Sequence, residues 1–295
     1  MTARLYHERI ARSDTTPARW LVLTHGIYGA GSNWRSIARK LNERRPEWGV
    51  VLVDLRQHGR SEPGTPPHTI AACAEDLRAL LAELGDVQAI AGHSFGGKVV
   101  LATRRLVELR QIWVLDASPS ARPGATVDRR SQIVGGGGPD GAADGAGGNA
   151  PRGIARDNTV IQVLELMEQA PPTWARRDDF VAAVVAAGHD VGLARWLAMS
   201  LVPDPAGGFK LRFDLAALRE MISDYHATDL WDVLEAPGGD VEVVIAERSS
   251  TVSAADRGRL AAAPPHVHVH EITAGHWLHI DAPAEVVDLF ASRLP

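Results

Sequence analysis

The feature that most constrains the fold of this chain is a regular alternation of short β-rich runs with helical patterns. Apolar residues at helical spacing separate the runs, and a closing helix is expected over Pro283–Arg293. This alternation is typical of βαβ units, so we expect a mostly parallel, twisted sheet flanked by helices. The predicted strands are Trp20–Thr24, Gly49–Asp54, Val87–Gly92, Gln111–Asp116, Val241–Ala246 and His266–Ile272.

The segment from 119 to 228 interrupts this alternation and is mostly helical in pattern. Val160, Val163, Leu164 and Met167 form one apolar stripe, and further helices are predicted over 180–187 and 193–201. We therefore predict a helical cap (119–228) inserted after the sixth strand of an α/β core that comprises 1–118 and 229–295. Within the cap, the glycine-rich stretch 135–153 is expected to be a flexible loop rather than a phosphate-binding site.

Composition narrows the class of protein. The 295 residues are 45% hydrophobic and 23% charged, as in an ordinary globular chain, and the net charge is −5. There is no Lys/Arg cluster of the kind that binds phosphate backbones, so we expect no nucleic-acid partner. A single cysteine, Cys73, cannot form an internal disulfide, and neither a signal peptide nor a membrane span is predicted. We expect a soluble, cytoplasmic protein.

The strongest chemical signal is Gly92-His93-Ser94-Phe95-Gly96-Gly97, which lies between a predicted strand and a helical pattern. It matches the G-x-S-x-G motif, in which a serine on a tight strand-to-helix turn exposes its hydroxyl. Small neighbours are needed because the turn brings nearby backbones close together. An ordinary glycine-rich turn is the competing interpretation. Ser94 is the predicted nucleophile.

A serine hydroxyl is a weak nucleophile and needs a base. Where the serine lies in a G-x-S-x-G motif, the histidine base is expected late in the chain, after the serine. His276 directly follows the last predicted strand and is the predicted base, whereas His279 is the competing residue with a structural or rim-lining role. The backbone amides of Ile27 and Phe95 are the predicted oxyanion donors. The histidines at 266, 268 and 270 alternate along a predicted half-exposed strand, so we interpret them as ordinary strand residues and predict no metal site.

These segments together resemble the α/β-hydrolase fold family, over all of the chain except the cap. His25-Gly26, the segment 54–61, the serine turn and Gly275-His276-Trp277 stand in the order of that family. More narrowly, Gly96-Gly97-Lys98 and the segment 114–119 are similar to small bacterial esterases and acyl-thioester hydrolases and their mitochondrial relatives. The resemblance implies a serine hydrolase that cleaves a small-molecule carboxylic ester or thioester through an acyl-enzyme, without a cofactor. It also implies a structural role for 54–61.

The acid of the triad departs from the pattern of the family. Most members place an aspartate in the loop after the strand here written Val241–Ala246, but this chain has Ser249 there. A serine cannot carry the charge that stabilises an imidazolium. The resemblance favours Asp116, because that branch can use an aspartate after the earlier strand with a serine at the usual position, so Ser249 becomes an auxiliary hydrogen-bonding group. Glu247 and then Asp256 are the alternatives.

Other functions fit the same fold, because fold does not fix reaction. A carbon–carbon bond hydrolase, a lyase, a perhydrolase, a cofactor-free dioxygenase and a slow-turnover small-molecule receptor all stay open. The serine excludes haloalkane dehalogenase chemistry, which needs an aspartate at that position. The active site is expected at the carboxyl ends of the strands beneath the cap. Four tryptophans are candidates to line an acyl pocket, with core packing as the alternative for each: Trp34, Trp174, Trp196 and Trp277.

Overall fold

The computed structural model of the protein describes residues 2–14, 16–122 and 159–295. Its strands are β1 (His7–Ile10), β2 (Arg19–Thr24), β3 (Trp48–Val53), β4 (Val87–His93), β5 (Gln111–Leu115), β6 (Leu201–Pro203), β7 (Phe209–Leu211), β8 (Asp240–Ala246) and β9 (Val267–Ile272). Its helices are η1 (Gly31–Trp34), α1 (Arg35–Arg44), α2 (Ile70–Leu84), α3 (Phe95–Thr103), α4 (Thr159–Gln169), α5 (Arg177–Ala186), α6 (Val191–Ala198), α7 (Leu215–Ala227), α8 (Trp231–Glu235), α9 (Ala254–Leu260), α10 (Leu278–Asp281) and α11 (Pro283–Arg293). The predicted flexible loop 135–153 lies outside the described residues.

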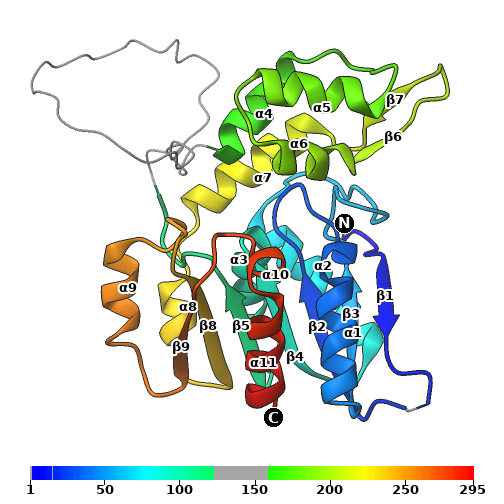
Figure 1. The fold of residues 1–295 in the computed structure, drawn as a ribbon. Helices are drawn as coiled ribbons and strands as arrows, with labels where there is room; N and C mark the ends of the chain where they lie inside the picture. The colour runs from blue at the N-terminus through cyan, green and yellow to red at the C-terminus, as the bar shows by residue number, and fades with distance from the viewer. Residues whose placement is uncertain (1, 15, 123–158) are drawn as a thin grey trace, which may run out of the picture.

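The central element is a sheet of seven strands in the order β1-β3-β2-β4-β5-β8-β9. The strands from β3 to β9 in that order pair in parallel, and β1 pairs with β3 in the antiparallel direction. Parallel strands joined by helices bury both faces of a sheet. One face packs on α1, α10 and α11 and the other on α2, α3 and α8, as Figure 1 shows. The predicted α/β-hydrolase architecture is confirmed.

The insertion follows one strand fewer than expected. We predicted that it comes after the sixth strand, but in the described part of the chain β5 is the fifth strand and the last before it. The reason is that the residues ahead of β2 contribute one short strand, β1, at the edge of the sheet.

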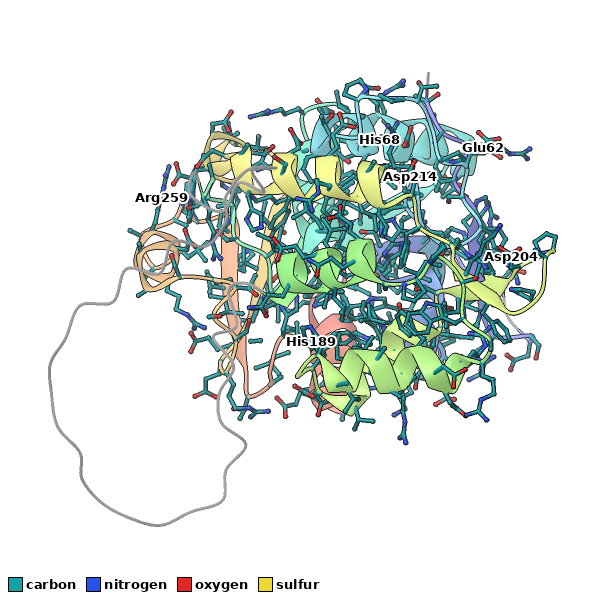
Figure 2. All side chains as sticks on the ribbon, turned by 90° about the horizontal axis from the view of Figure 1, so that it is seen from above. Glu62, His68, His189, Asp204, Asp214 and Arg259 are labelled. Carbon is teal, nitrogen blue, oxygen red and sulfur yellow. The ribbon has the colours of Figure 1, made fainter. Side chains whose placement is uncertain are left out.

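Four helices and a small hairpin lie above the carboxyl ends of the parallel strands (Figure 1). They are α4, α5, α6 and α7, with the hairpin formed by β6 and β7. From above, α4 lies between α7, which begins after Asp214, and α5, which ends near His189 (Figure 2). The helical stripes predicted near 160–167, 180–187 and 193–201 correspond to α4, α5 and α6.

A buried lysine in α3 ties the ends of this insertion to the core. The Nζ of Lys98 donates to the carbonyl oxygens of Ser120, Tyr225 and Thr228 at 2.7–2.9 Å. Ser120 lies at the start of the segment 119–228 and the other two lie at its end, so a single ammonium group connects both ends of the insertion to α3. Burial lowers the pKa of Lys98 to about 8.

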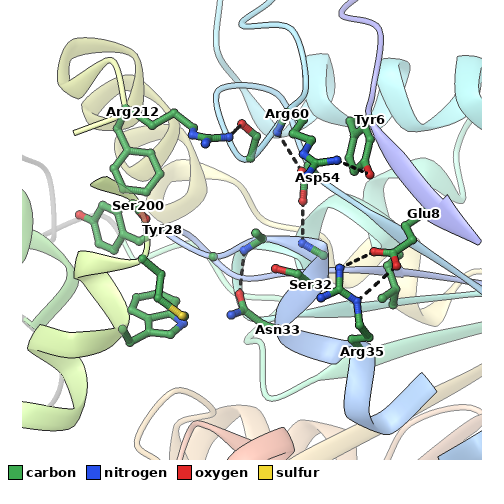
Figure 3. A pocket seen from close by; sticks show the side chains of 18 residues that line it. Tyr6, Glu8, Tyr28, Ser32, Asn33, Arg35, Asp54, Arg60, Ser200 and Arg212 are labelled. Atoms are coloured by element: carbon green, nitrogen blue, oxygen red, sulfur yellow. Dashed lines mark hydrogen bonds and ion pairs between the residues drawn. The ribbon is translucent and has the colours of Figure 1, made fainter. Parts of the chain in front are cut away.

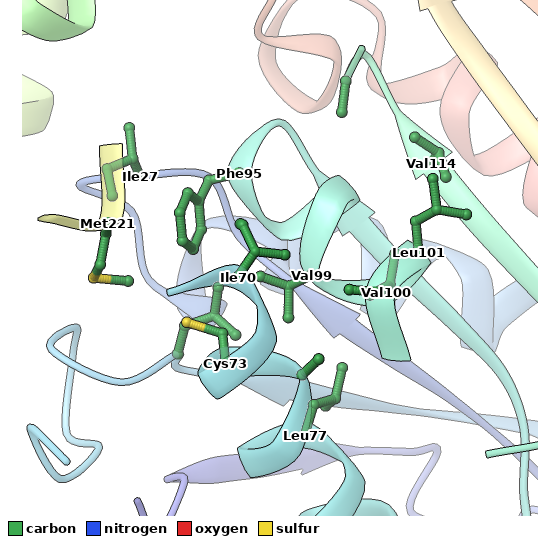
Figure 4. Packing of buried hydrophobic residues seen from close by; sticks show 14 of the residues in the cluster. Ile27, Ile70, Cys73, Leu77, Phe95, Val99, Val100, Leu101, Val114 and Met221 are labelled. Atoms are coloured by element: carbon green, nitrogen blue, oxygen red, sulfur yellow. The ribbon is translucent and has the colours of Figure 1, made fainter. Parts of the chain in front are cut away.

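The apolar core continues from the sheet into the insertion. Phe95, at the start of α3, belongs to the same buried cluster as Ile27 and as Met221 of α7 (Figure 4). Ile70 and Val99 extend this cluster between α2 and α3. The loop after β2, the helix after β4 and the insertion are therefore packed against one another at the end of the sheet where the predicted site lies.

Candidate active site

Ser94 occupies a strained turn between β4 and α3. Its backbone has φ 53° and ψ −116°, a left-handed conformation that side chains rarely adopt. Glycine is required on both sides, since a Cβ on Gly92 would lie 2.0 Å from the carbonyl oxygen of Gly96, and one on Gly96 would lie 2.6 Å from that of His25. The turn holds the half-buried Ser94 side chain at the carboxyl end of the sheet and at the N-terminus of α3. Strain of this kind is characteristic of functional sites.

Asp116 and His276 are brought together by two different strand ends. The Oδ2 of Asp116, directly after β5, lies 2.6 Å from the Nδ1 of His276, in the loop after β9. The Asp116 side chain is fully buried, whereas that of His276 is 30% exposed. The other oxygen of the carboxylate, Oδ1, accepts from the amide of Ala246 at 3.1 Å, which fixes the orientation of the group. Within the described ranges, the ring of His276 makes its hydrogen bonds through Nδ1, and its Nε2 makes no hydrogen bond.

The serine turn is joined to both of these residues through the backbone and through His93. The amide of Ser94 donates to the carbonyl of Leu115, the residue before Asp116, at 2.9 Å. The Nε2 of His93 donates to the carbonyl oxygen of His276 at 2.7 Å. Burial, with His276 and His279 nearby, lowers the pKa of His93 well below its ordinary value, so its ring is neutral and one nitrogen remains a donor.

The alternative acids lie elsewhere. Glu247 is exposed and accepts from the hydroxyl of Thr273 at 2.8 Å. Asp256 is buried, accepts from Ser118 and Ser120, and caps the first turn of α9. Both carboxylates therefore have partners other than His276.

Ser249 reaches the base through a residue that we did not predict. Its Oγ donates to the Oγ1 of Thr251 at 3.0 Å, and that oxygen lies 3.1 Å from the Nδ1 of His276. Thr251 thus stands between the predicted auxiliary serine and the histidine. Its side chain is neutral and belongs to no recognisable motif, so the sequence gives no signal for it.

The loop after β2 lies beside the serine turn. A Cβ built on Gly26 would lie 3.2 Å from the Cβ of Ser94, so the absence of a side chain at Gly26 lets the loop approach the serine turn closely. Ile27 directly follows Gly26. The backbone N–H groups of Ile27 and Phe95 have no hydrogen-bond acceptor among the residues that the structure describes. Amides that are free at the end of a strand and at the start of a helix can bind a developing oxyanion.

Two neutral histidines hold this loop in place. The amide of Leu55 donates to the Nε2 of His25 at 3.0 Å, and that of Tyr28 donates to the Nε2 of His58 at 3.1 Å. Their rings lie 4.9 Å apart. Burial lowers the pKa of His25 to about 4, and burial together with nearby His25 lowers that of His58 to about 3. Uncharged rings can accept these bonds, and protonated rings cannot.

These pKa values predict that the protein loses stability in mild acid. His58 has a pKa of about 3 in the folded protein and about 6.5 when unfolded, so its contribution is complete above pH 6.5 and is lost as the pH falls toward 3. Between these two pKa values the loss is on the order of 1 kcal/mol per pH unit. Urea unfolding between pH 6 and 4 should show a pH slope of the unfolding free energy that is smaller by this amount in His58→Gln. Equal slopes in the two proteins would contradict the burial of a neutral His58.

The four tryptophans predicted to line an acyl pocket lie in different parts of the structure. Trp34 is fully buried in the core, with its ring 4.7 Å from that of His279. Trp174 packs against Phe180 in the insertion. Trp196 of α6 lies edge to face against Trp277, the residue after His276, with the ring centroids 4.4 Å apart. Burial lowers the pKa of His279 to about 4, so it is neutral.

The histidines of β9 have carboxylate neighbours that the sequence did not reveal. The Nε2 of His270 lies 2.5 Å from the Oε2 of Glu242 on the adjacent strand β8, and Arg293 binds the same carboxylate. The parallel pairing of β8 with β9 brings the carboxylate of Glu242 beside His270, although the two residues are far apart in the sequence. Within the described ranges, no group of three or more His, Cys, Asp or Glu residues is arranged to hold a metal ion.

Comparison with known proteins places the chain in a family. A sequence profile described as the alpha/beta hydrolase family matches residues 21–289. The chain belongs to this family. The match covers the strands from β3 onward, most of β2, the serine turn and the loop of His276.

The relatives of this α/β hydrolase include esterases and lipases. It is 27% identical over 287 residues to the sn-1-specific diacylglycerol lipase ABHD11 of Mus musculus, which covers 95% of this chain and 81% of the relative. It is 26% identical over 278 residues to the esterase YbfF of Escherichia coli strain K12, with 90% and 89% covered. These relatives support an enzyme that hydrolyses an ester.

Solved structures show the same fold. A marine microorganism esterase superposes with a TM-score of 0.75 at 20% identity, covering 99% of this chain and all of that one. A thioesterase domain from the curacin biosynthetic pathway superposes with a TM-score of 0.64 at 17% identity, covering 97% and 95%. Among the described residues of this hydrolase, no helix has the length and apolar character to cross a bilayer.

Proposed function

We propose that the protein is a serine-dependent hydrolase of carboxylic esters or acyl thioesters, with Ser94 as nucleophile, His276 as base and Asp116 as acid. The observation that carries the proposal is the 2.6 Å hydrogen bond between a fully buried Asp116 carboxylate and His276, with Ser94 in a positive-φ turn whose amide donates to the carbonyl of Leu115, the residue before Asp116. A carboxylate on Nδ1 fixes the tautomer in which Nε2 can accept a proton. The amides of Ile27 and Phe95 are the proposed oxyanion donors.

The reaction then proceeds in two acyl transfers. His276 takes the proton of Ser94 as the Oγ attacks the carbonyl carbon, and the amides of Ile27 and Phe95 stabilise the oxyanion. His276 returns the proton to the leaving alcohol or thiol as its bond to carbon breaks, which leaves an acyl-enzyme. Water, deprotonated by His276, attacks this acyl-enzyme and releases the carboxylic acid and Ser94. No cofactor is needed for either step.

Ester and thioester substrates share this mechanism, because both present a carbonyl with a leaving group that needs one proton. The ester is favoured by the relatives named esterase and lipase. The thioester is included because a thioesterase domain shares the fold. In this proposal the segment 119–228 acts as a cap over the strand ends, where it covers the small-molecule substrate.

Two histidine variants test the proposal. Their kcat is measured with p-nitrophenyl esters of increasing acyl length and with an acyl-coenzyme A thioester. His276→Ala should lower kcat by several orders of magnitude, because the base for Ser94 is lost. His279→Ala should change kcat by less than tenfold, since His279 packs on Trp34 and makes no contact with Asp116. Equal losses, or a larger loss in His279→Ala, would overturn the assignment of the base.

A further inference from the structure

A cavity of about 320 Å³ lies behind the loop of Ile27, between the core and the insertion (Figure 3). The core side is formed by the segment from Tyr28 to Asn33 and by side chains of β1 and of the loop after β3. The insertion contributes Trp196, Ser200 and Arg212. Ser94 and His276 are not among its walls. The cavity is therefore separate from the catalytic groups.

The cavity carries an excess of positive charge in a chain of net charge −5. Three guanidinium groups and two carboxylates line it. One of each forms a pair, because Arg35 binds both oxygens of Glu8. The second carboxylate, Asp54, is buried and accepts from the amides of Gly31 and Arg60 at 2.7 and 2.9 Å.

The remaining two guanidinium groups have donors to spare. Arg60 donates one N–H to the hydroxyl of Tyr6 at 2.9 Å, and Arg212 donates one to the carbonyl of Gly59. No carboxylate lies within ion-pair distance of either in the described part of the chain. Each guanidinium offers five N–H donors in a planar fork that suits a carboxylate or phosphate. Figure 3 shows Arg60 and Arg212 on the same side of the cavity.

The cavity shares two walls with the catalytic loops. Tyr28 lines it and directly follows Ile27, the proposed oxyanion donor. Trp196 lines it and packs at 4.4 Å against Trp277, the residue after His276. These two contacts connect the walls of the cavity to the loops that carry the proposed oxyanion donor and the proposed base.

We propose that this cavity binds a carboxylate or phosphate group of the substrate, with Arg60 and Arg212 as the residues that recognise it. The inference rests on the proposed function, since it assigns a second group of the same ester. The net positive charge of the lining and the spare donors of Arg60 and Arg212 favour an anion over an uncharged polar group, because a charge-assisted hydrogen bond is stronger than a neutral one. The protein would then select esters that carry a negative charge at a distance from the scissile bond.

Two comparisons of anionic with neutral esters test this selection. The first compares the mono-p-nitrophenyl esters of dicarboxylic acids with four to eight carbons with neutral p-nitrophenyl esters of equal length. The second compares 4-acetoxybenzoate with its methyl ester. At least one anionic ester should be preferred in kcat/KM. Arg212→Gln and Arg60→Gln should reduce this preference roughly tenfold to a hundredfold, mostly through KM. Glutamine can still donate to Gly59 or Tyr6, so the two variants remove the charge and keep the structural bond.

Arg105→Gln is the matched control. Arg105 is exposed and pairs with Asp232, far from these walls, so its loss removes the same charge without affecting the preference. Equal effects of all three substitutions, or no preference for any anionic ester, would overturn the proposal. Inorganic phosphate distinguishes the source of the anion. Inhibition that is competitive with the anionic ester supports a substrate subsite, and binding that depends on Arg212 but does not compete would show a separate anion site and contradict it.

The proposed function is tested independently in the same samples. A neutral fluorophosphonate that labels Ser94 reports on the catalytic groups and carries no carboxylate. No preference for an anionic ester in the unaltered protein, with labelling of Ser94 intact, would overturn the anion subsite alone. Failure of labelling in the unaltered protein would instead overturn the serine mechanism.

Discussion

Ser94→Ala is expected to lower kcat for a p-nitrophenyl ester by a factor on the order of 10⁶, to a rate that only the oxyanion amides and substrate binding support. The hydroxyl forms the covalent bond to the acyl group, and no neighbouring side chain replaces it. The fold should persist, because alanine and serine both carry a Cβ and the strain at φ 53° is the same for both.

Steady-state kinetics with matched thermal unfolding measure this effect. Ser292→Ala serves as the control, since that hydroxyl is exposed in α11 and bonds to the carbonyl of Leu289. The control should retain the kcat of the unaltered protein. Turnover by Ser94→Ala within tenfold of the unaltered protein would show that the nucleophile lies elsewhere.

Asp116→Asn is the second large effect that we expect, with a loss in kcat on the order of 10⁴. The amide oxygen of the asparagine can still accept from Ala246, as Oδ1 of the carboxylate does at 3.1 Å. Its NH₂ group then faces the Nδ1 of His276 and favours the tautomer that cannot take the proton of Ser94. Asparagine tolerates the φ of 45° at this position, so the substitution should be structurally mild.

Glu247→Gln and Thr251→Val complete this test. Glu247 bonds to Thr273 and should be nearly silent in kcat. Thr251 lies 3.1 Å from the same nitrogen of His276 and carries no charge, so its loss should cost about tenfold or less. A large loss in Glu247→Gln with a mild one in Asp116→Asn would transfer the role of the acid to the glutamate.

Strands buried on both faces were predictable because they form continuous apolar runs. The predicted run Val87–Gly92 is β4 to within one residue, and Pro283–Arg293 is α11 as predicted. Shorter elements were missed. The sequence of β1, His7–Ile10, is polar and half exposed at a sheet edge, and the three-residue strands β6 and β7 are too short to show a period.

The candidate site was predictable where chemistry dictates residue type. Ser94 and His276 follow from a glycine-flanked serine and a histidine after the last strand, and the choice of Asp116 needed a family resemblance. Thr251, His93 and His58 were not predicted as parts of the site. Their roles depend on contacts between segments far apart in the chain, such as the bond from His93 to the carbonyl of His276.

The cavity with Arg60 and Arg212 could not be predicted from the sequence either, because it also depends on contacts between distant segments. Arg60 belongs to the loop after β3 and Arg212 to the segment between β7 and α7, and the two are 152 positions apart in the sequence. Only the docking of the insertion onto the core brings them to one cavity. Charge patterning along the sequence shows two isolated arginines, which are ordinarily solvated surface residues.

The most direct test of the account is to trap the acyl-enzyme. Rapid mixing with p-nitrophenyl acetate, acid quenching and peptide mass analysis should place one acetyl group on the peptide that contains Ser94, with a burst of p-nitrophenol close to one per protein. Asp116→Asn should form the same adduct far more slowly. An acetyl group on a different residue, or full turnover with no adduct and no burst, would contradict the proposed mechanism.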